Sequence, residues 1–173
     1  MLDALTHEFS VSGPVPLSII IVRLVGAAIL CGFIGLERER QKFTAGLRTN
    51  MLIGLAAAGF ALITTFLMAM SPPSPDHVRM DPIRLVEAVT AGVAFLAAGI
   101  VVFSRGKVHG LTTGASMWLS GTIGLAAGLG YWNIAVPASV AGLVVLYLLY
   151  RVELAAGMKK KEREEENGRE ERI

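Results

Sequence analysis

Three ionisable residues lie within otherwise apolar stretches of this chain, and their side chains are the ones that could do chemistry: Arg23, Arg84 and Glu87. Arg84 and Glu87 are three positions apart, which places both on one face of a helix. Because an ionisable side chain inside a membrane is costly, it usually contacts a partner or a water-filled cavity. We therefore expect an intramembrane polar cluster of these three residues. It would act as an ion-pair clasp, as a proton- or ion-responsive switch, or, without pairing, through side chains that extend to the membrane surface.

The composition of the chain indicates a membrane protein. Hydrophobic residues make up 53% of the sequence and charged residues 17%, whereas soluble domains carry about 25% charged residues. Glycine occurs 19 times, as in packed transmembrane helices whose small residues let backbones approach closely. The formal net charge is only +2, and no basic patch is interleaved with aromatic residues, so we expect no nucleic-acid partner.

Hydropathy predicts five membrane spans, because a helix needs about 20 apolar residues to cross a bilayer. The predicted spans are Leu17–Leu36, Asn50–Met70, Pro82–Phe103, Leu111–Gly130 and Ile134–Leu149. We therefore expect an all-α integral membrane protein, a bundle of about five transmembrane helices, with a tight turn between the last two. The expected organisation is an extracytoplasmic segment at residues 1–16, a transmembrane helical domain at 17–150 and a charged cytoplasmic tail at 151–173.

The distribution of basic residues predicts the orientation of the bundle. Lysine and arginine concentrate in the segments 37–49, 105–107 and 151–173, whereas Arg79 is alone in the other connecting segments. Since basic residues are enriched in cytoplasmic loops, we expect the N-terminus outside and the C-terminus in the cytoplasm. This orientation places the predicted polar cluster in the outer leaflet, within roughly 3–9 Å of the boundary at about 1.5 Å per helical residue.

A charged segment between the first two spans is expected to form a cytoplasmic hinge. Its marked residues are Glu37, Arg38, Arg48 and Thr49, and we interpret it as structure and as a contact surface for a cytoplasmic partner. Small residues recur at spacings that favour close helix contact, within the chain or between copies of it. The glycines assigned to helix packing are Gly32, Gly35, Gly92, Gly99, Gly110, Gly114, Gly124 and Gly128.

The sequence offers little for catalysis or metal binding. It contains no HExxH motif and no pairing of serine with histidine or of cysteine, histidine and aspartate at a plausible depth. The single cysteine, Cys31, fits no zinc or redox motif. We therefore expect no enzyme, no catalytic residue, no metal site and no cofactor.

Several motifs together resemble the MgtC/SapB family of membrane proteins. They are Arg23-Leu24, Gly32-x-x-Gly35-Leu-Glu-Arg38, Ala45-Gly-Leu-Arg-Thr49, Gly92-Val-Ala-Phe-Leu-Ala-Ala-Gly99 and Gly110-Leu-Thr-Thr-Gly-Ala-Ser-Met-Trp118 followed by Gly124 and Gly128. The match covers about residues 20–130, in the family's order. The family usually has an amide four positions after the arginine of the third span, where this chain has Ala88, with Glu87 one position earlier. Its best-known members also carry a soluble C-terminal domain, whereas we expect only the charged tail here.

The resemblance implies a bacterial inner-membrane protein linked to magnesium limitation, acid stress and intracellular survival. Family members are thought to modulate other membrane machines, the ATP synthase among them, so the first hypothesis is a regulator without catalysis. Its expected partners are the lipid bilayer, another membrane protein or complex, and a further copy of itself. The second hypothesis is a dimeric transporter or channel for an ion or small solute. Arg23, Arg84 and Glu87 would form its outer gate, and Glu37 with Arg48 its inner gate.

Overall fold

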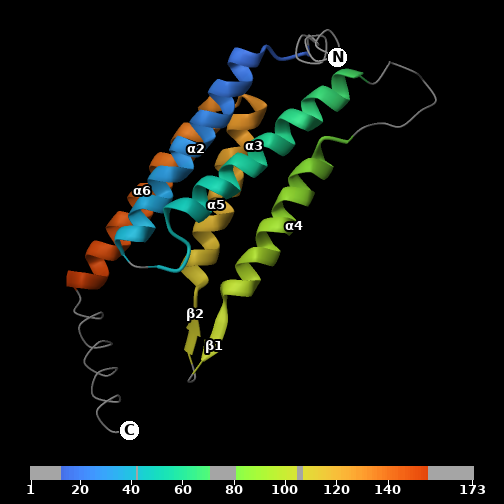
Figure 1. Ribbon diagram of the computed structural model, residues 1–173. Coiled ribbons are helices and arrows are strands. Elements are labelled where there is room, and N and C mark those ends of the chain that lie inside the picture. The colour runs from blue at the N-terminus through green and yellow to red at the C-terminus, as the bar shows by residue number, and fades with distance from the viewer. Residues whose placement is uncertain (1–12, 42, 71–80, 105–106, 156–173) are drawn as a thin grey trace, which may run out of the picture.

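Five helices and one short hairpin form the part of the chain that the structure describes (Figure 1). The structure is a computed structural model, and it describes residues 13–41, 43–70, 81–104 and 107–155. The helices are α2 (Leu17–Arg40), α3 (Leu47–Met70), α4 (Ile83–Ile100), α5 (Leu111–Leu129) and α6 (Trp132–Ala155). Most of the expected N-terminal segment, and residues 156–173 of the expected tail, lie outside the described residues. The predicted all-α fold class is confirmed.

Four of the helices are long and apolar enough to cross a membrane. They are α2, α3, α4 and α6, and α5 is not among them. The reason lies in the position of α5, which contacts each of the other four helices and runs through the middle of the bundle (Figure 1). A helix wrapped by protein does not need an apolar surface toward lipid, so α5 can carry glycine, serine and threonine instead.

Small residues allow α5 to lie directly against α3. A Cβ atom added at Gly128 would lie 2.6 Å from the Cα atom of Ala58, and one added at Gly124 would overlap the backbone of Gly54. Such distances are shorter than any ordinary carbon contact. The Gly124–Gly128 spacing on α5 therefore faces the Gly54–Ala58 spacing on α3, as in the small-residue contacts of membrane helices.

A tight turn joins α5 to α6, as the sequence predicts. Gly130 adopts the left-handed conformation with φ 87°, and the N–H of Tyr131 donates to the carbonyl of Ala126 at 2.8 Å. This arrangement terminates a helix with glycine in the conformation that other residues avoid. α6 then begins at Trp132 and continues beyond the predicted end of the last span.

The third predicted span ends earlier as a helix than expected. α4 stops at Ile100, and Val102–Ser104 forms strand β1, which pairs antiparallel with β2 (Lys107–His109). The run of β-branched and aromatic residues that begins at Val101 favours extended backbone over helix. The hairpin leads into α5 through Gly110, which has φ 88°.

The predicted hinge is shorter than the sequence suggests, because both neighbouring helices extend into it. α2 continues to Arg40 and α3 begins at Leu47. Glu37 and Arg38 therefore belong to the last turn of α2, and Arg48 with Thr49 to the first turn of α3.

α4 stands at the edge of the bundle (Figure 1). It contacts α5 and α3, and Val93 is its one buried residue. Val93 packs with Ile53 of α3 and Met117 of α5, so a single row of side chains attaches α4 to the rest of the bundle.

Candidate functional site

Arg23 joins α2 to the turn between α5 and α6. Its Nη1 atom donates a hydrogen bond to the carbonyl of Gly128 at 2.9 Å. The carbonyl end of a helix carries partial negative charge, which a guanidinium stabilises. The Nε atom of Arg23 is buried and has no hydrogen-bond partner among the described residues. The side chain of Arg23 therefore caps the carbonyl end of α5.

The structure does not bring Arg84 and Glu87 together with Arg23. Both lie exposed on α4, and no hydrogen bond or ion pair of either side chain occurs within the described part of the chain. The separation follows from helix packing, because α4 packs on α5 and α3 whereas Arg23 projects from α2 onto the end of α5. The three predicted members of the polar cluster therefore occupy two sites.

Arg38 lies inside the bundle, and only 1% of its surface is exposed. Its Nη2 atom donates to the hydroxyl oxygen of Thr113 on α5 at 3.1 Å, and its guanidinium lies 3.6 Å from the ring centroid of Phe43. A cation over an aromatic face is attracted by the ring, more strongly when water is excluded. Arg38 therefore connects α2, the loop after it and α5, and it is not part of an outward contact surface.

The other residues of the predicted hinge shape the connection between α2 and α3. Glu37 accepts a hydrogen bond from Gln41 at 2.8 Å. Glu39 accepts one from the backbone N–H of Leu47 at 2.7 Å, which satisfies a free donor at the start of α3. Arg48 and Glu39 are exposed, whereas Glu37 and Thr49 are half-buried.

A buried amide network, which the sequence analysis missed, lies among α2, α3 and α5. The Nδ2 atom of Asn50 donates to the carbonyls of Ala45 and Gly46 at 3.2 and 2.9 Å. Its Oδ1 atom accepts a hydrogen bond from Ser120 at 2.8 Å, and the Cys31 thiol donates to the Ser120 carbonyl at 3.4 Å. An asparagine at the start of an apolar span was the available signal, since a buried amide needs partners.

The glycines assigned to packing divide into two groups. Gly32, Gly35, Gly114, Gly124 and Gly128 lie against neighbouring helices or loops, and Gly110 has a positive φ. At Gly92 and Gly99 of α4, an added Cβ atom would meet nothing within 4 Å. These two glycines are therefore not used for packing within the described chain.

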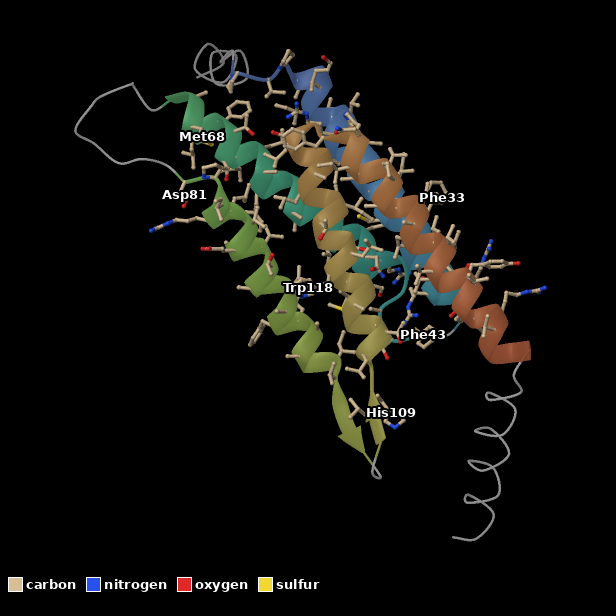
Figure 2. The ribbon with its side chains drawn as sticks, turned by 180° about the vertical axis from the view of Figure 1, so that it is seen from behind. Phe33, Phe43, Met68, Asp81, His109 and Trp118 are labelled. Atoms are coloured by element: carbon tan, nitrogen blue, oxygen red, sulfur yellow. The ribbon has the colours of Figure 1, made fainter. Side chains whose placement is uncertain are left out.

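A large apolar groove runs between α3 and α4, with a volume of about 1020 Å³. Its lining from α3 extends from Leu52 to Met68, and its lining from α4 and the preceding residues extends from Asp81 to Leu96. Arg84 and Asp81 are its charged lining residues. In Figure 2, Met68 and Asp81 lie at one end of the molecule and His109 at the other. The groove is thus apolar along its length and charged at one end.

The described residues do not gather ligands for a metal ion. Within them, no group of three or more histidine, cysteine, aspartate or glutamate side chains is close enough to hold one. The polar interior consists instead of hydroxyls, an amide, a thiol and Arg38.

Comparison with known proteins relates most of the chain to one family. The model of the MgtC family matches residues 24–155. A relative from Escherichia coli K12, named "Putative magnesium transporter YhiD", is 39% identical over 76% of this chain and 61% of its own length. "Protein MgtC" from Salmonella typhimurium LT2 is 36% identical over 75% of this chain and 52% of its own length.

The matched region begins within α2, one residue after Arg23, and contains every later element to the end of α6. The chain spans about half to three-fifths of the length of these relatives. No solved structure matches it. With a family model covering most of the chain and a helical bundle long and apolar enough to cross a membrane several times, this chain belongs to the MgtC family and is a multi-pass membrane protein.

Proposed function

We propose that this protein is a non-catalytic regulator of the bacterial inner membrane that acts by contact with another membrane protein. The observation that carries this proposal is the state of Glu87, an exposed carboxylate on a membrane-length helix with no hydrogen bond or ion pair in the described chain. A carboxylate in such a position is unfavourable unless a partner or water satisfies it. A donor group on a neighbouring membrane helix would supply that partner.

The residues around Glu87 suit contact with another helix. We call Glu87, Ala91, Phe95 and Ala98 the outer face of α4, since their spacing places them on one side of the helix. All four are exposed, Phe95 to 80%. Exposed apolar side chains alone are ordinary in a membrane, but Ala91 and Ala98, seven positions apart on this face, are small residues of the kind that let a second backbone approach closely.

Several buried polar side chains hydrogen-bond to other helices, which favours a function at the surface of the bundle over one in its interior. Asn50 and Ser120 bond each other, Arg38 bonds Thr113 and Ser139 donates to the carbonyl of Leu30. These polar groups bond one helix to another, which favours a structural role for the interior.

The names of the relatives and the family resemblance suggest when the regulator acts. One relative is named as a putative magnesium transporter, and the resemblance points to magnesium limitation and acid or intracellular stress. We therefore propose that the protein acts in the response to low magnesium. The distribution of basic residues favours an N-terminus outside and a C-terminus in the cytoplasm.

Photo-cross-linking in the source membrane tests the contact. A photoreactive amino acid at Phe95 should give a discrete adduct with a membrane protein in cells grown at low magnesium. The same amino acid at Val144 of α6, which is 54% exposed, is the matched control and should not. Adding Glu87→Gln should reduce the Phe95 adduct, because the amide removes the charge that the partner satisfies. Equal adducts at the two positions, or adducts with lipid alone, would contradict the proposal.

A dimeric transporter or channel is the alternative, which the name of the Escherichia coli relative favours. Its proposed outer gate loses support from the separation of Arg23 from Arg84 and Glu87. Purified protein in liposomes containing a magnesium-sensitive dye decides between the two roles. Magnesium entry that depends on the protein and is lost in Glu87→Gln would establish transport and reject the regulator.

A further inference from the structure

The groove between α3 and α4 has the features of a site for one lipid molecule. Its walls carry exposed apolar side chains, among them Phe60 and Ile63, each 57% exposed. An apolar groove in a membrane helix bundle is filled by acyl chains or by another helix, because a void would forfeit dispersion contacts.

The length of the groove favours acyl chains. On α4, its lining extends from Arg84 to Leu96, which is about 18 Å at a rise of about 1.5 Å per residue. One leaflet of the hydrocarbon core is about 15 Å thick, half of the full 30 Å that a transmembrane helix must cross. Beyond Leu96, α4 packs against α5, where a Cβ at Gly114 would lie 3.2 Å from the Cβ of Ala97. On α3 the lining extends from Leu52 to Met68, about 24 Å at the same rise, so the groove is long enough to hold the acyl chains of one leaflet.

The charged end of the groove favours a zwitterionic headgroup. Arg84 supplies a guanidinium, which binds phosphate oxygens, and its side chain has no hydrogen bond or ion pair within the described residues. Asp81 supplies a carboxylate, one oxygen of which accepts a hydrogen bond from the N–H of Ile83 at 2.9 Å. A cation and an anion that line the same end of the groove complement a phosphate and an ammonium on one headgroup. A purely anionic headgroup would be repelled by the carboxylate of Asp81.

We propose that this groove is a binding site for a phospholipid of the phosphatidylethanolamine class. The acyl chains lie between α3 and α4, the phosphate contacts Arg84 and the ammonium contacts Asp81. The site is separate from the outer face of α4, so it does not depend on the regulatory role proposed above. Bound lipid would fill the space beside the single row of side chains that holds α4 to the bundle.

Native mass spectrometry of the full-length purified protein tests the site. The lipid-bound fraction is measured with phosphatidylethanolamine and with phosphatidylglycerol of the same acyl chains. The wild type should bind the former more tightly. Arg84→Gln should weaken binding of both lipids by roughly ten- to a hundredfold, the effect of losing one hydrogen bond to a charged group. Asp81→Asn should remove the preference between them.

Two glycines of α4 provide a matched pair of variants. Both have open space around them, but Gly92 lines the groove and Gly99 does not. Gly92→Leu should fill the groove and reduce lipid binding, whereas Gly99→Leu should leave it unchanged. Ala88→Leu, which fills the same groove from an exposed position, replaces Gly92→Leu if that variant does not fold. Equal lipid binding by the groove-filling variant and Gly99→Leu overturns the proposal. So does equal or tighter binding of phosphatidylglycerol by the wild type, or a polypeptide that copurifies in place of lipid.

Discussion

At the scale of single residues, two arginines of similar sequence context have opposite environments. Arg38 is buried between Thr113 and Phe43, whereas Arg40, two positions later, is exposed. The difference follows from helical geometry, since residues two apart project about 200° from each other at 3.6 residues per turn. One side of α2 faces α5 at this level and the other does not, so the two charges serve different purposes.

Arg38→Gln should lower the free energy of unfolding by about 2–3 kcal/mol, because it removes a buried charged hydrogen bond and the contact with Phe43. Arg40→Gln, at an exposed position, should change it by no more than about 0.5 kcal/mol. Thermal unfolding in one detergent, followed by circular dichroism, measures both. Arg38→Lys should recover little stability, since an ammonium lacks the planar fork of guanidinium. Equal stability of the two glutamine variants would show that the burial of Arg38 has little effect.

At the scale of elements, helical glycines have two different environments: some lie against a neighbouring helix and others do not. Gly124 sets the distance between α5 and α3, while Gly59, also on α3, has nothing within 4 Å of an added Cβ atom. Glycine in a helix costs about 0.5–1 kcal/mol relative to alanine. At Gly124 the close contact with α3 offsets this cost. At Gly59 no contact within the described chain offsets it.

Gly124→Ala should therefore destabilise the bundle by about 1–3 kcal/mol, because the new methyl group meets the backbone of Gly54. Gly59→Ala should be neutral or stabilising by up to about 1 kcal/mol. The melting temperatures of the two variants, measured side by side in the same detergent, give the comparison. Destabilisation by Gly59→Ala would indicate a contact at α3 with something outside the described chain.

The sequence was sufficient to predict the order of the helices but not the pairs of side chains between them. Hydropathy located all five helices and the turn at Tyr131, because length and apolarity are local properties. The partners of Arg38 and Asn50 lie 75 and 70 positions away along the chain, so they depend on how each helix is rotated against its neighbour. The same reason explains why Arg23, Arg84 and Glu87, which the sequence predicts at similar depth, do not meet.

At the scale of the whole molecule, the orientation in the membrane stays a prediction from the distribution of basic residues. The two ends of α5 provide markers for it, since Tyr131 and His109 are both exposed and lie beyond opposite ends of that helix. His109 is visible at the hairpin in Figure 2.

Single cysteines at these positions should report opposite sides of the membrane. In a Cys31→Ala background, Tyr131→Cys should react with a membrane-impermeant maleimide in intact spheroplasts. His109→Cys should react only after the membrane is opened, because we expect the hairpin in the cytoplasm. The reverse pattern of labelling would show that the N-terminus lies inside.

The position of α5 has a consequence for how the protein is made. The translocon recognises a segment by its own hydrophobicity, and α5 is the described helix that is not among the four long and apolar enough to cross a membrane. The next helix along the chain is α6, which follows a turn at Gly130 and Tyr131 and is apolar enough to cross a membrane. We expect α5 to leave the translocon together with α6 as a helical hairpin, after α2 and α3 have already entered the bilayer. The most buried helix would then be among the last to be inserted, and the order of synthesis would protect its polar face from lipid.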